Sequence, residues 1–520
     1  MAITRTLLSQ RIRTGLSASW PPAVNARALA AGVGLWLSIS ALLALIQFAS
    51  PAPVGIDGYY HLRLAQLVRV DGLMPEFRWL PLTILSAQNY YDHHFLYHLL
   101  LAPFAWGDPS AGGAAALALG GKIASSLFAS LAFMAVWVGL RRNVRWASLW
   151  TLGLFALSAA FLYRMSMPRA QSVSLLLLVI SFFLLAERRD RWLLPLGFVY
   201  VWMYDAFPLL LLLAACRVAA DLVITRRFDL RPVLYASVGI GLGLLINPYF
   251  PRDLVFVARH LLPKLGAPGI PVGSEWYPYD TWTLVVDSGP AFVALVAGFF
   301  FLGKQGSRLS RATVMSMLLA LAFGLLFMKS RRFAEYFPPF SLIFLALAAS
   351  PWLEQLAGSG PQWTRRIPAA MVLLLLLPLG WTTWHARKDV AASAPLERYG
   401  AAATWMGSHS QPGELVFQTD WDDFPRLFFY DTVNAYTVGL DPTYLQLADA
   451  QLYDDWVAIT RGTVHQPSSM IAARFGAAYV FSDLDHTAFL DEAESDPGLQ
   501  EIYRDRMAVI YRVLSSAEQR

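Results

Sequence analysis

The chain has 520 residues, of which 56% are hydrophobic and only 15% are charged, and its formal net charge is +5. This composition excludes a protein made of several soluble domains and indicates one that crosses a membrane several times. The chain has one cysteine, Cys216, which excludes an intramolecular disulfide.

Residues 1–27 carry four arginines and no signal-peptide cleavage pattern, so we expect a cytoplasmic tail there. A helix needs about 20 apolar residues to cross a hydrocarbon core about 30 Å thick. By this criterion residues 28–385 form a transmembrane domain of about eleven helices. The predicted crossings are 28–50, 113–140, 146–163, 172–186, 192–204, 206–224, 232–246, 291–302, 312–328, 336–350 and 367–385.

The basic residues test this assignment independently. With the tail inside, every inner connection is basic, as the positive-inside rule expects. These connections are 141–145, 188–191, 226–231, 304–311 and 365–366. The sequence therefore predicts a multi-pass protein of the cell (inner or plasma) membrane. Its outer segments are the loops 51–112 and 247–290, the short connections 164–171 and 329–335, and the C-terminal segment.

After residue 385 the apolar runs shorten and polar residues return. Segments 414–419, 435–439, 477–482 and 508–513 are typical of strands, and 424–430 is typical of a short helix. Residues 386–520 are therefore predicted to form a small extracytoplasmic α/β domain.

The first outer loop contains a candidate metal site. Carboxylate oxygens are preferred by hard divalent cations, which neutralise a leaving pyrophosphate, and imidazole is a common metal ligand. Asp57, Asp92 and His94 are therefore candidate ligands for Mg²⁺ or Mn²⁺, with Asp57 a candidate base as well. In the alternative interpretation Asp57 caps a helix, and Asp92 and His94 make ordinary hydrogen bonds in an aromatic-rich loop.

Arg331 and Arg332 lie in an outer connection, against the positive-inside trend. A guanidinium offers several donors to phosphate oxygens, so both are candidates for binding a phosphate group. Anchoring at lipid headgroups is the alternative. Glu275 lies beside Trp276 and Tyr277, which suggests sugar or acceptor contact or else an interfacial aromatic belt.

Four short motifs resemble those of the oligosaccharyltransferase catalytic subunits, within the GT-C superfamily of polyprenyl-phosphate-dependent glycosyltransferases. Asp57-Gly-Tyr-Tyr-His-Leu-Arg is similar to the acidic motif of their first loop, and Ser274-Glu275 is similar to part of a motif in a late external loop. Ser330-Arg331-Arg332-Phe333 resembles the segment whose arginine meets the donor phosphate. Trp421-Asp422 resembles part of their Trp-Trp-Asp-Tyr-Gly acceptor motif. The resemblance implies a GT-C-like fold, catalytic roles for Asp57 and Glu275, and acceptor binding by Trp421 and Asp422.

The chain also departs from this family. The second acidic motif belongs in the segment 164–171, which contains no carboxylate here, so Asp92 and His94 are the substitutes for the metal. Asp420 and Asp423-Phe424 stand where the acceptor motif has Trp and Tyr-Gly. Because of these departures, the family's two-motif metal site and its recognition of an Asn sequon do not carry over directly to this chain.

The sequence thus predicts a membrane glycosyltransferase. It would move a sugar or glycan from a polyprenyl-phosphate-linked donor to a protein, glycan or lipid acceptor at the outer face, with no nucleic-acid partner. The alternative is a noncatalytic membrane protein that binds or assembles lipid-linked glycans.

Overall fold

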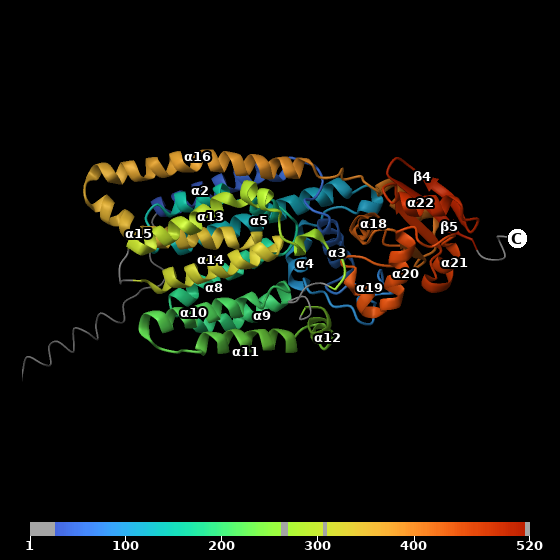
Figure 1. Cartoon of the computed structure of the whole chain (residues 1–520), viewed down its shortest axis with the longest axis horizontal. Helices are drawn as coiled ribbons and strands as arrows, with labels where there is room; N and C mark the ends of the chain where they lie inside the picture. Colours follow the sequence, from blue (N-terminus) through green and yellow to red (C-terminus); the bar gives the residue numbers. More distant parts are fainter. Residues whose placement is uncertain (1–25, 262–268, 305–308, 515–520) are drawn as a thin grey trace, which may run out of the picture.

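Apolar helices run side by side from α2 (Ala26–Gln47) to α16 (Pro361–Ala391), and a small sheet lies beyond one end of them (Figure 1). This computed structural model describes residues 26–261, 269–304 and 309–514, so most of the predicted tail lies outside the described residues. Between α2 and α16 the bundle contains α5 (Ala114–Leu140), α6 (Ala147–Leu152), η3 (Gly153–Ala156), α7 (Ala159–Met165), α8 (Gln171–Ala186), η4 (Asp190–Trp192), α9 (Leu193–Met203), α10 (Leu209–Thr225), α11 (Arg231–Leu245), α13 (Thr281–Lys304), α14 (Arg311–Lys329) and α15 (Phe337–Gly358).

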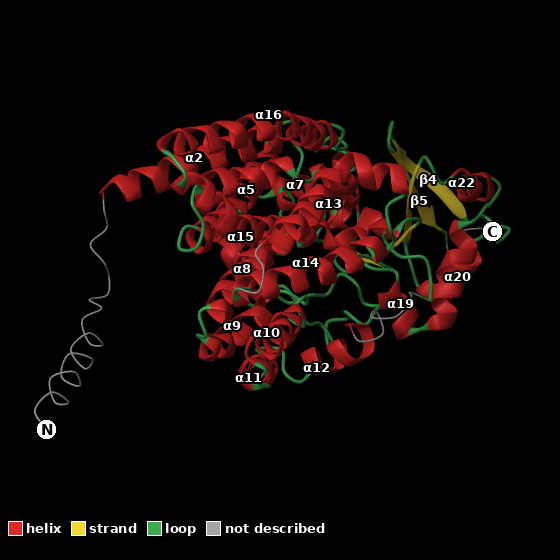
Figure 2. Ribbon diagram, turned by 60° about the vertical axis from the view of Figure 1, so that its left-hand side comes forward, coloured by secondary structure: helices red, strands yellow, loops and turns green. Residues whose placement is uncertain are grey.

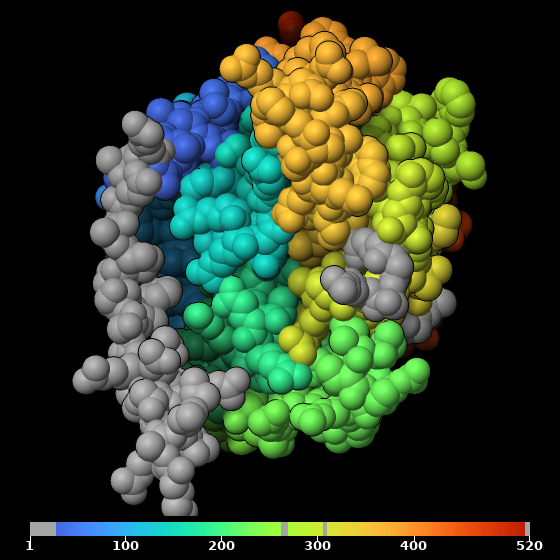
Figure 3. All heavy atoms as spheres, turned by 90° about the vertical axis from the view of Figure 1, so that its left-hand side faces the viewer, coloured from blue at the N-terminus to red at the C-terminus, as the bar shows by residue number. Residues whose placement is uncertain are grey.

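The outer surface of the bundle is apolar. On α16, Leu373, Leu374 and Leu377 are 70%, 76% and 82% exposed, as suits side chains that face hydrocarbon. Residues of α16 form one edge of the bundle in the end-on view (Figure 3, orange). By length and composition, six helices in the described part can cross a membrane, or seven if α6–η3 and α7 count as one span. The predicted polytopic helical class therefore agrees with the structure, and the number of eleven crossings stays a prediction.

Three predicted boundaries differ from the structure. The crossing 146–163 is broken by a 97° bend between Ala156 and Ala159, where extended Ser158 caps α7 by accepting a hydrogen bond from the Phe161 N–H. The helix α13 begins at Thr281, not at 291, and continues through Pro290. The helix α16 likewise begins earlier than predicted, at Pro361, and extends to Ala391, with Pro368 and Pro378 in its interior. A helix tolerates proline where its lost hydrogen bond is compensated by packing.

A layer of short helices lies between the bundle and the sheet. The loop 51–112 folds into α3 (Asp57–Asp71), α4 (Phe95–Leu101), η1 (Ala102–Phe104) and η2 (Pro109–Ala111). The later outer segments contribute α12 (Arg252–Phe256), η5 (Val257–Leu261), η7 (Ser274–Trp276) and η8 (Arg331–Glu335). Asp57 therefore begins a helix, whose other residues are mostly buried, and does not lie in a free loop.

The C-terminal part contains a five-stranded mixed sheet of order β2-β1-β3-β5-β4 (Figure 2). The strands β1 (Leu415–Gln418), β2 (Ala435–Tyr436) and β3 (Tyr479–Asp483) are parallel, whereas β4 (Leu499–Arg504) and β5 (Ala508–Val513) form an antiparallel hairpin. The helices here are α17 (Gly400–His409), η9 (Trp421–Asp423), α18 (Phe424–Tyr430), α19 (Thr443–Ala448), α20 (Ala450–Thr460), α21 (Ser468–Met470), η10 (Ile471–Phe475) and α22 (Thr487–Glu494).

The sequence predicts all of these strands except the edge strand β4. Only Leu499 of this strand is buried, and Glu501 pairs with Arg504 along it, so the strand lacks the apolar alternation of a half-buried strand. Helix α18 packs on α3, where the Arg426 guanidinium lies 5.2 Å from the centre of the Tyr59 ring. The Tyr436 N–H donates to the Trp79 carbonyl across the same interface. The segment 51–112 therefore connects the sheet to the bundle through these contacts.

We predict that the α10–α11 connection lies on the cytoplasmic side and the β4–β5 hairpin on the opposite side, because the α10–α11 connection and the first turns of α16, which contain Arg365 and Arg366, are basic and lie at the end away from the sheet (Figure 1). Cys216 is the one cysteine of the chain, so a Cys216→Ser background permits single-cysteine labelling. In sealed right-side-out vesicles, a membrane-impermeant maleimide should label Met507→Cys at once and Phe228→Cys only after permeabilisation. Both residues are exposed. Immediate labelling of Phe228→Cys would contradict this topology.

Candidate functional site

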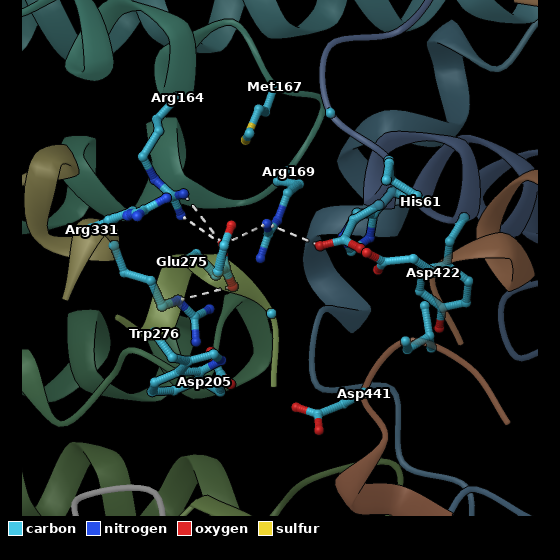
Figure 4. Close-up of a pocket in the computed structure, with 18 of the residues that line it drawn as sticks. His61, Arg164, Met167, Arg169, Asp205, Glu275, Trp276, Arg331, Asp422 and Asp441 are labelled. Carbon is cyan, nitrogen blue, oxygen red and sulfur yellow. Dashed lines mark hydrogen bonds and ion pairs between the residues drawn. The ribbon is translucent and has the colours of Figure 1, made fainter. Parts of the chain in front are cut away.

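A cavity of about 400 Å³ opens where the outer layer meets the C-terminal part (Figure 4). Its walls include the start of α3, the α7–α8 turn, η7, η8 and the residues Trp421 and Asp422 of η9. Seven site residues that the sequence singled out line it together: Asp57, His94, Glu275, Arg331, Arg332, Trp421 and Asp422. Chain segments that are far apart in the sequence thus converge on one space.

Glu275 is the centre of the charged wall. Its carboxylate lies 3.2 Å from an Arg164 nitrogen, 3.1 Å from Arg169 and 3.4 Å from Arg332. Although burial alone would raise the pKa of Glu275, these guanidinium groups hold it well below its usual range. Arg164 also donates through Nε, at 2.7 Å, to Glu335, which is 1% exposed. Glu275 is therefore ionised at all physiological pH values.

Asp57 is the second carboxylate of this wall, and its environment differs. Its Oδ2 lies 2.9 Å from Nη1 of Arg169, and its side chain is 29% exposed. Burial, with Glu275 nearby, raises the pKa of Asp57 despite the attraction of Arg169. Two neighbouring carboxylates thus have pKa values shifted in opposite directions, which is a common arrangement for groups with different chemical tasks.

The two arginines of η8 are not equivalent. Arg332 pairs with Glu275, donates to the Tyr204 hydroxyl at 3.0 Å, and lies 4.4 Å from the centre of the Trp276 ring. Arg331 donates to the Pro278 carbonyl and stacks on Tyr279, and it has no ion-pair partner among the described residues. Of the two, Arg331 has the positive charge that no carboxylate neutralises.

Trp421 and Asp422 form the opposite wall. They lie in η9, directly after β1, and Asp420 caps this turn by accepting a hydrogen bond from the Asp422 N–H at 3.0 Å. Burial, together with the negative charge of Asp57 and Asp420, raises the pKa of Asp422 to about 8. The Asp422 carboxyl is therefore largely protonated near neutral pH and can donate a hydrogen bond.

The predicted metal ligands are not assembled as a metal site. Asp92 does not line the cavity, because its carboxylate accepts hydrogen bonds from the His94 N–H at 3.0 Å and from Nδ1 of His98 at 2.7 Å. His94 lines the cavity, but neither of its ring nitrogens has a hydrogen-bond partner in the described structure. No group of three or more His, Cys, Asp or Glu side chains among the described residues is arranged to hold a metal. The set Asp57, Asp92 and His94 therefore does not fit a divalent ion as these residues lie.

Asp92 instead orients a chain of two histidines. His98 directs Nδ1 at Asp92 and Nε2 at Nδ1 of His61, over 2.8 Å. When Asp92 accepts a hydrogen bond from Nδ1–H of His98, Nε2 of His98 is left to accept a hydrogen bond from Nδ1–H of His61. This order leaves Nε2 of His61 unprotonated, and burial lowers the pKa of His61 well below its usual value. His61 lines the cavity as a neutral imidazole.

Sequence analysis missed several residues of this site, above all Arg164, Arg169, Glu335, Tyr204 and His98. Arg164 and Arg169 flank the turn where a carboxylate motif was sought and not found. Under the predicted topology, two arginines in this short connection are an exception to the positive-inside trend, as are Arg331 and Arg332. This exception was the signal in the sequence that could have identified Arg164 and Arg169 as site residues.

No protein-family model matches the chain. Among curated proteins, the dolichyl-phosphooligosaccharide-protein glycotransferase 3 of Archaeoglobus fulgidus is 25% identical over 260 residues. The match covers 42% of this chain and spans less than a third, 30%, of that relative's length.

Solved structures match nearly the whole chain at low identity. The oligosaccharyltransferase AglB from Archaeoglobus fulgidus, in complex with an inhibitory peptide and a dolichol-phosphate, has a TM-score of 0.60 at 16% identity, over 94% of this chain and 74% of that one. ArnT from Cupriavidus metallidurans, bound to undecaprenyl phosphate, has a TM-score of 0.54 at 15% identity, over 93% and 98%. The mycobacterial arabinofuranosyltransferase AftD has a TM-score of 0.52 at 16% identity, over 92% and 40%. The Archaeoglobus oligosaccharyltransferase was also solved in complex with zinc and sulfate.

These three proteins share one architecture, and the resemblance to GT-C glycosyltransferases is confirmed at the level of the fold. The chain has the fold of the GT-C membrane glycosyltransferases.

Proposed function

We propose that this protein transfers a sugar or glycan from a polyprenyl-phosphate-linked donor to an acceptor at the outer face of the membrane. The observation that carries the proposal is the pairing of charges in one cavity at the end of an apolar bundle: two carboxylates with oppositely shifted pKa values and four arginines. The similar structures that hold dolichol-phosphate and undecaprenyl phosphate support a donor of this class.

On the donor side, the phosphate would lie against η8. Arg331 has a positive charge that is not neutralised by an ion pair in the described structure, and it lies beside the ends of apolar helices. An arginine near hydrocarbon is costly unless an anion accompanies it, so a lipid-linked phosphate suits this position. Arg332, which pairs with Glu275, would add a second positive charge near the phosphate.

In the transfer step, the bond between the anomeric carbon and the phosphate oxygen breaks, and the phosphate leaves with the electron pair. The acceptor nucleophile forms the new bond to that carbon, and its proton passes to Asp57. The raised pKa of Asp57 favours this role, since a carboxylate with a higher pKa is the stronger base. Trp421 and protonated Asp422 would contact the acceptor from the opposite wall.

Replacement of Asp57 by Asn should lower the transfer rate by about 10²- to 10⁴-fold, because the base is lost while the size of the side chain is kept. Asp71→Asn is the matched control, since Asp71 is the exposed last residue of the same helix. The assay follows release of the polyprenyl phosphate from a labelled donor. Unchanged transfer by the Asp57 variant would remove this aspartate from the mechanism. A parent that binds the donor without any turnover would instead support the noncatalytic alternative.

Replacement of Arg331 by Ala should weaken binding of undecaprenyl phosphate in detergent by about 10- to 100-fold, as expected for the loss of one charge-assisted contact. The double variant with Arg332→Ala should bind still more weakly. Arg226→Ala, at the far end of the bundle, should bind like the parent. If the double variant binds the lipid phosphate as tightly as the parent, the phosphate-binding assignment is wrong.

Replacement of Asp422 by Asn should remove a pH dependence of stability. In the unfolded chain the pKa of this carboxyl returns to its ordinary value of 3.8, so only the folded protein holds the proton between that value and about 8. The contribution to stability is therefore full below about pH 4, falls as the pH rises, and is lost above about pH 8. Because Asn is neutral throughout, the Tm of the variant relative to the parent should rise between pH 5 and pH 9. Asp454→Asn, at an exposed site, should track the parent. Parallel Tm curves for the Asp422 variant and the parent would refute the protonated state.

A further inference from the structure

Arg169 occupies the space between the two carboxylates of the cavity. One nitrogen, Nη1, lies 2.9 Å from Asp57 and 3.1 Å from Glu275, and the Arg169 side chain is only 10% exposed (Figure 4). The residue belongs to the α7–α8 turn, the connection in which a second acidic motif was expected. The carboxylate motif of this turn is thus replaced by a cation that bridges the remaining carboxylates.

We propose that the Arg169 guanidinium is the resident cation of this site, which stabilises the charge of the leaving phosphate in the place of a divalent metal. The proposal rests on the glycosyl transfer proposed above and deepens it, because it assigns the source of the positive charge. The bond that breaks and the path of the proton stay as described, and no further reactant is needed.

The surrounding charges oppose a divalent ion between Asp57 and Glu275. A metal that bound Glu275 at the usual oxygen distance of about 2.0–2.6 Å would lie close to the guanidinium groups of Arg164, Arg169 and Arg332, all of which contact the same carboxylate. Like charges at such separations in a buried site repel strongly. Both carboxylate oxygens of Glu275 and Oδ2 of Asp57 are already in ion pairs with arginines.

Arg169 has capacity beyond its two ion pairs. A guanidinium has five N–H donors, and Nη1 makes both contacts. The Nε atom of Arg169 is buried and has no hydrogen-bond partner in the described part of the chain. A donor phosphate in the cavity would provide acceptors for such groups, and a guanidinium matches phosphate oxygens in geometry as well as in charge.

The first experiment measures Mn²⁺ binding to the purified full chain by electron paramagnetic resonance, which needs no transfer assay. The parent should bind no stoichiometric Mn²⁺. Arg169→Asp, which removes the cation and returns a carboxylate to the turn, should bind about one Mn²⁺ per chain. Arg252→Asp, with the same change of charge at an exposed outer position, should bind none. One Mn²⁺ per chain in the parent that is lost in Asp57→Asn would overturn the proposal.

The second experiment measures transfer. The parent should keep its rate in excess EDTA, Arg169→Gln should lose about 10²-fold or more in kcat/KM, and Arg169→Lys should recover part of the loss by restoring the charge. If Arg169 has only a structural role, the Gln and Lys variants should lose equal activity, and that result would contradict the proposal. Loss of the parent's activity in EDTA, with recovery when Mn²⁺ is added, would contradict it too. If the chain transfers no sugar at all, the proposed function fails, while the Mn²⁺ titration still decides whether Arg169 holds the cation position.

Discussion

The carboxylate of Glu275 is shared by three guanidinium groups, and it links segments that enter the outer layer from different helices. Arg164 and Arg169 belong to α7 and the turn after it, whereas Arg332 follows α14. Buried charges are tolerated only when each has partners, so removal of any one of these groups would leave others uncompensated. The two carboxylates differ in pKa because the arginines outweigh burial at Glu275, whereas burial outweighs them at Asp57.

The second requirement is a rigid connection between the bundle and the sheet. Helix α3 meets both partners: Asp57, its first residue, faces the charged wall, and Tyr59, two residues later, packs against Arg426 and Phe429 of α18. Trp421 precedes α18 directly, so the same contact that holds the sheet also places the wall opposite to Glu275. One short helix therefore sets the separation between the proposed donor and acceptor sides of the cavity.

Much of the fold could be predicted because its signals are local. The helix Phe424–Tyr430 and the strand Ala508–Val513 were predicted to the residue, since both are apolar runs with clear ends. The strand Leu499–Arg504 could not be, because an exposed edge strand lacks a buried face to mark it. The sequence also identified seven residues that line the cavity, six of them in short motifs and His94 as a candidate metal ligand. The partner of Asp57 was missed because Arg169 meets Asp57 and Glu275 only through tertiary folding, and Glu275 is 106 residues further along the chain. Asp92 was assigned to a metal because its sequence neighbours are histidines, whereas its side-chain partner is the imidazole of His98, six residues further on.

The order in which these walls occur along the chain has a consequence for biosynthesis. Asp57, the α7–α8 turn, η7 and η8 all precede α16, whereas η9 and the helices that close the cavity come after it. Since a membrane protein is made from its N-terminus, the arginine and glutamate cluster is complete before Trp421 is synthesised. A nascent chain would thus possess the anion-attracting half of the cavity while it still lacks the opposite wall. Docking of α18 on α3 must therefore follow synthesis of the other walls, and it adds the wall that contains Trp421.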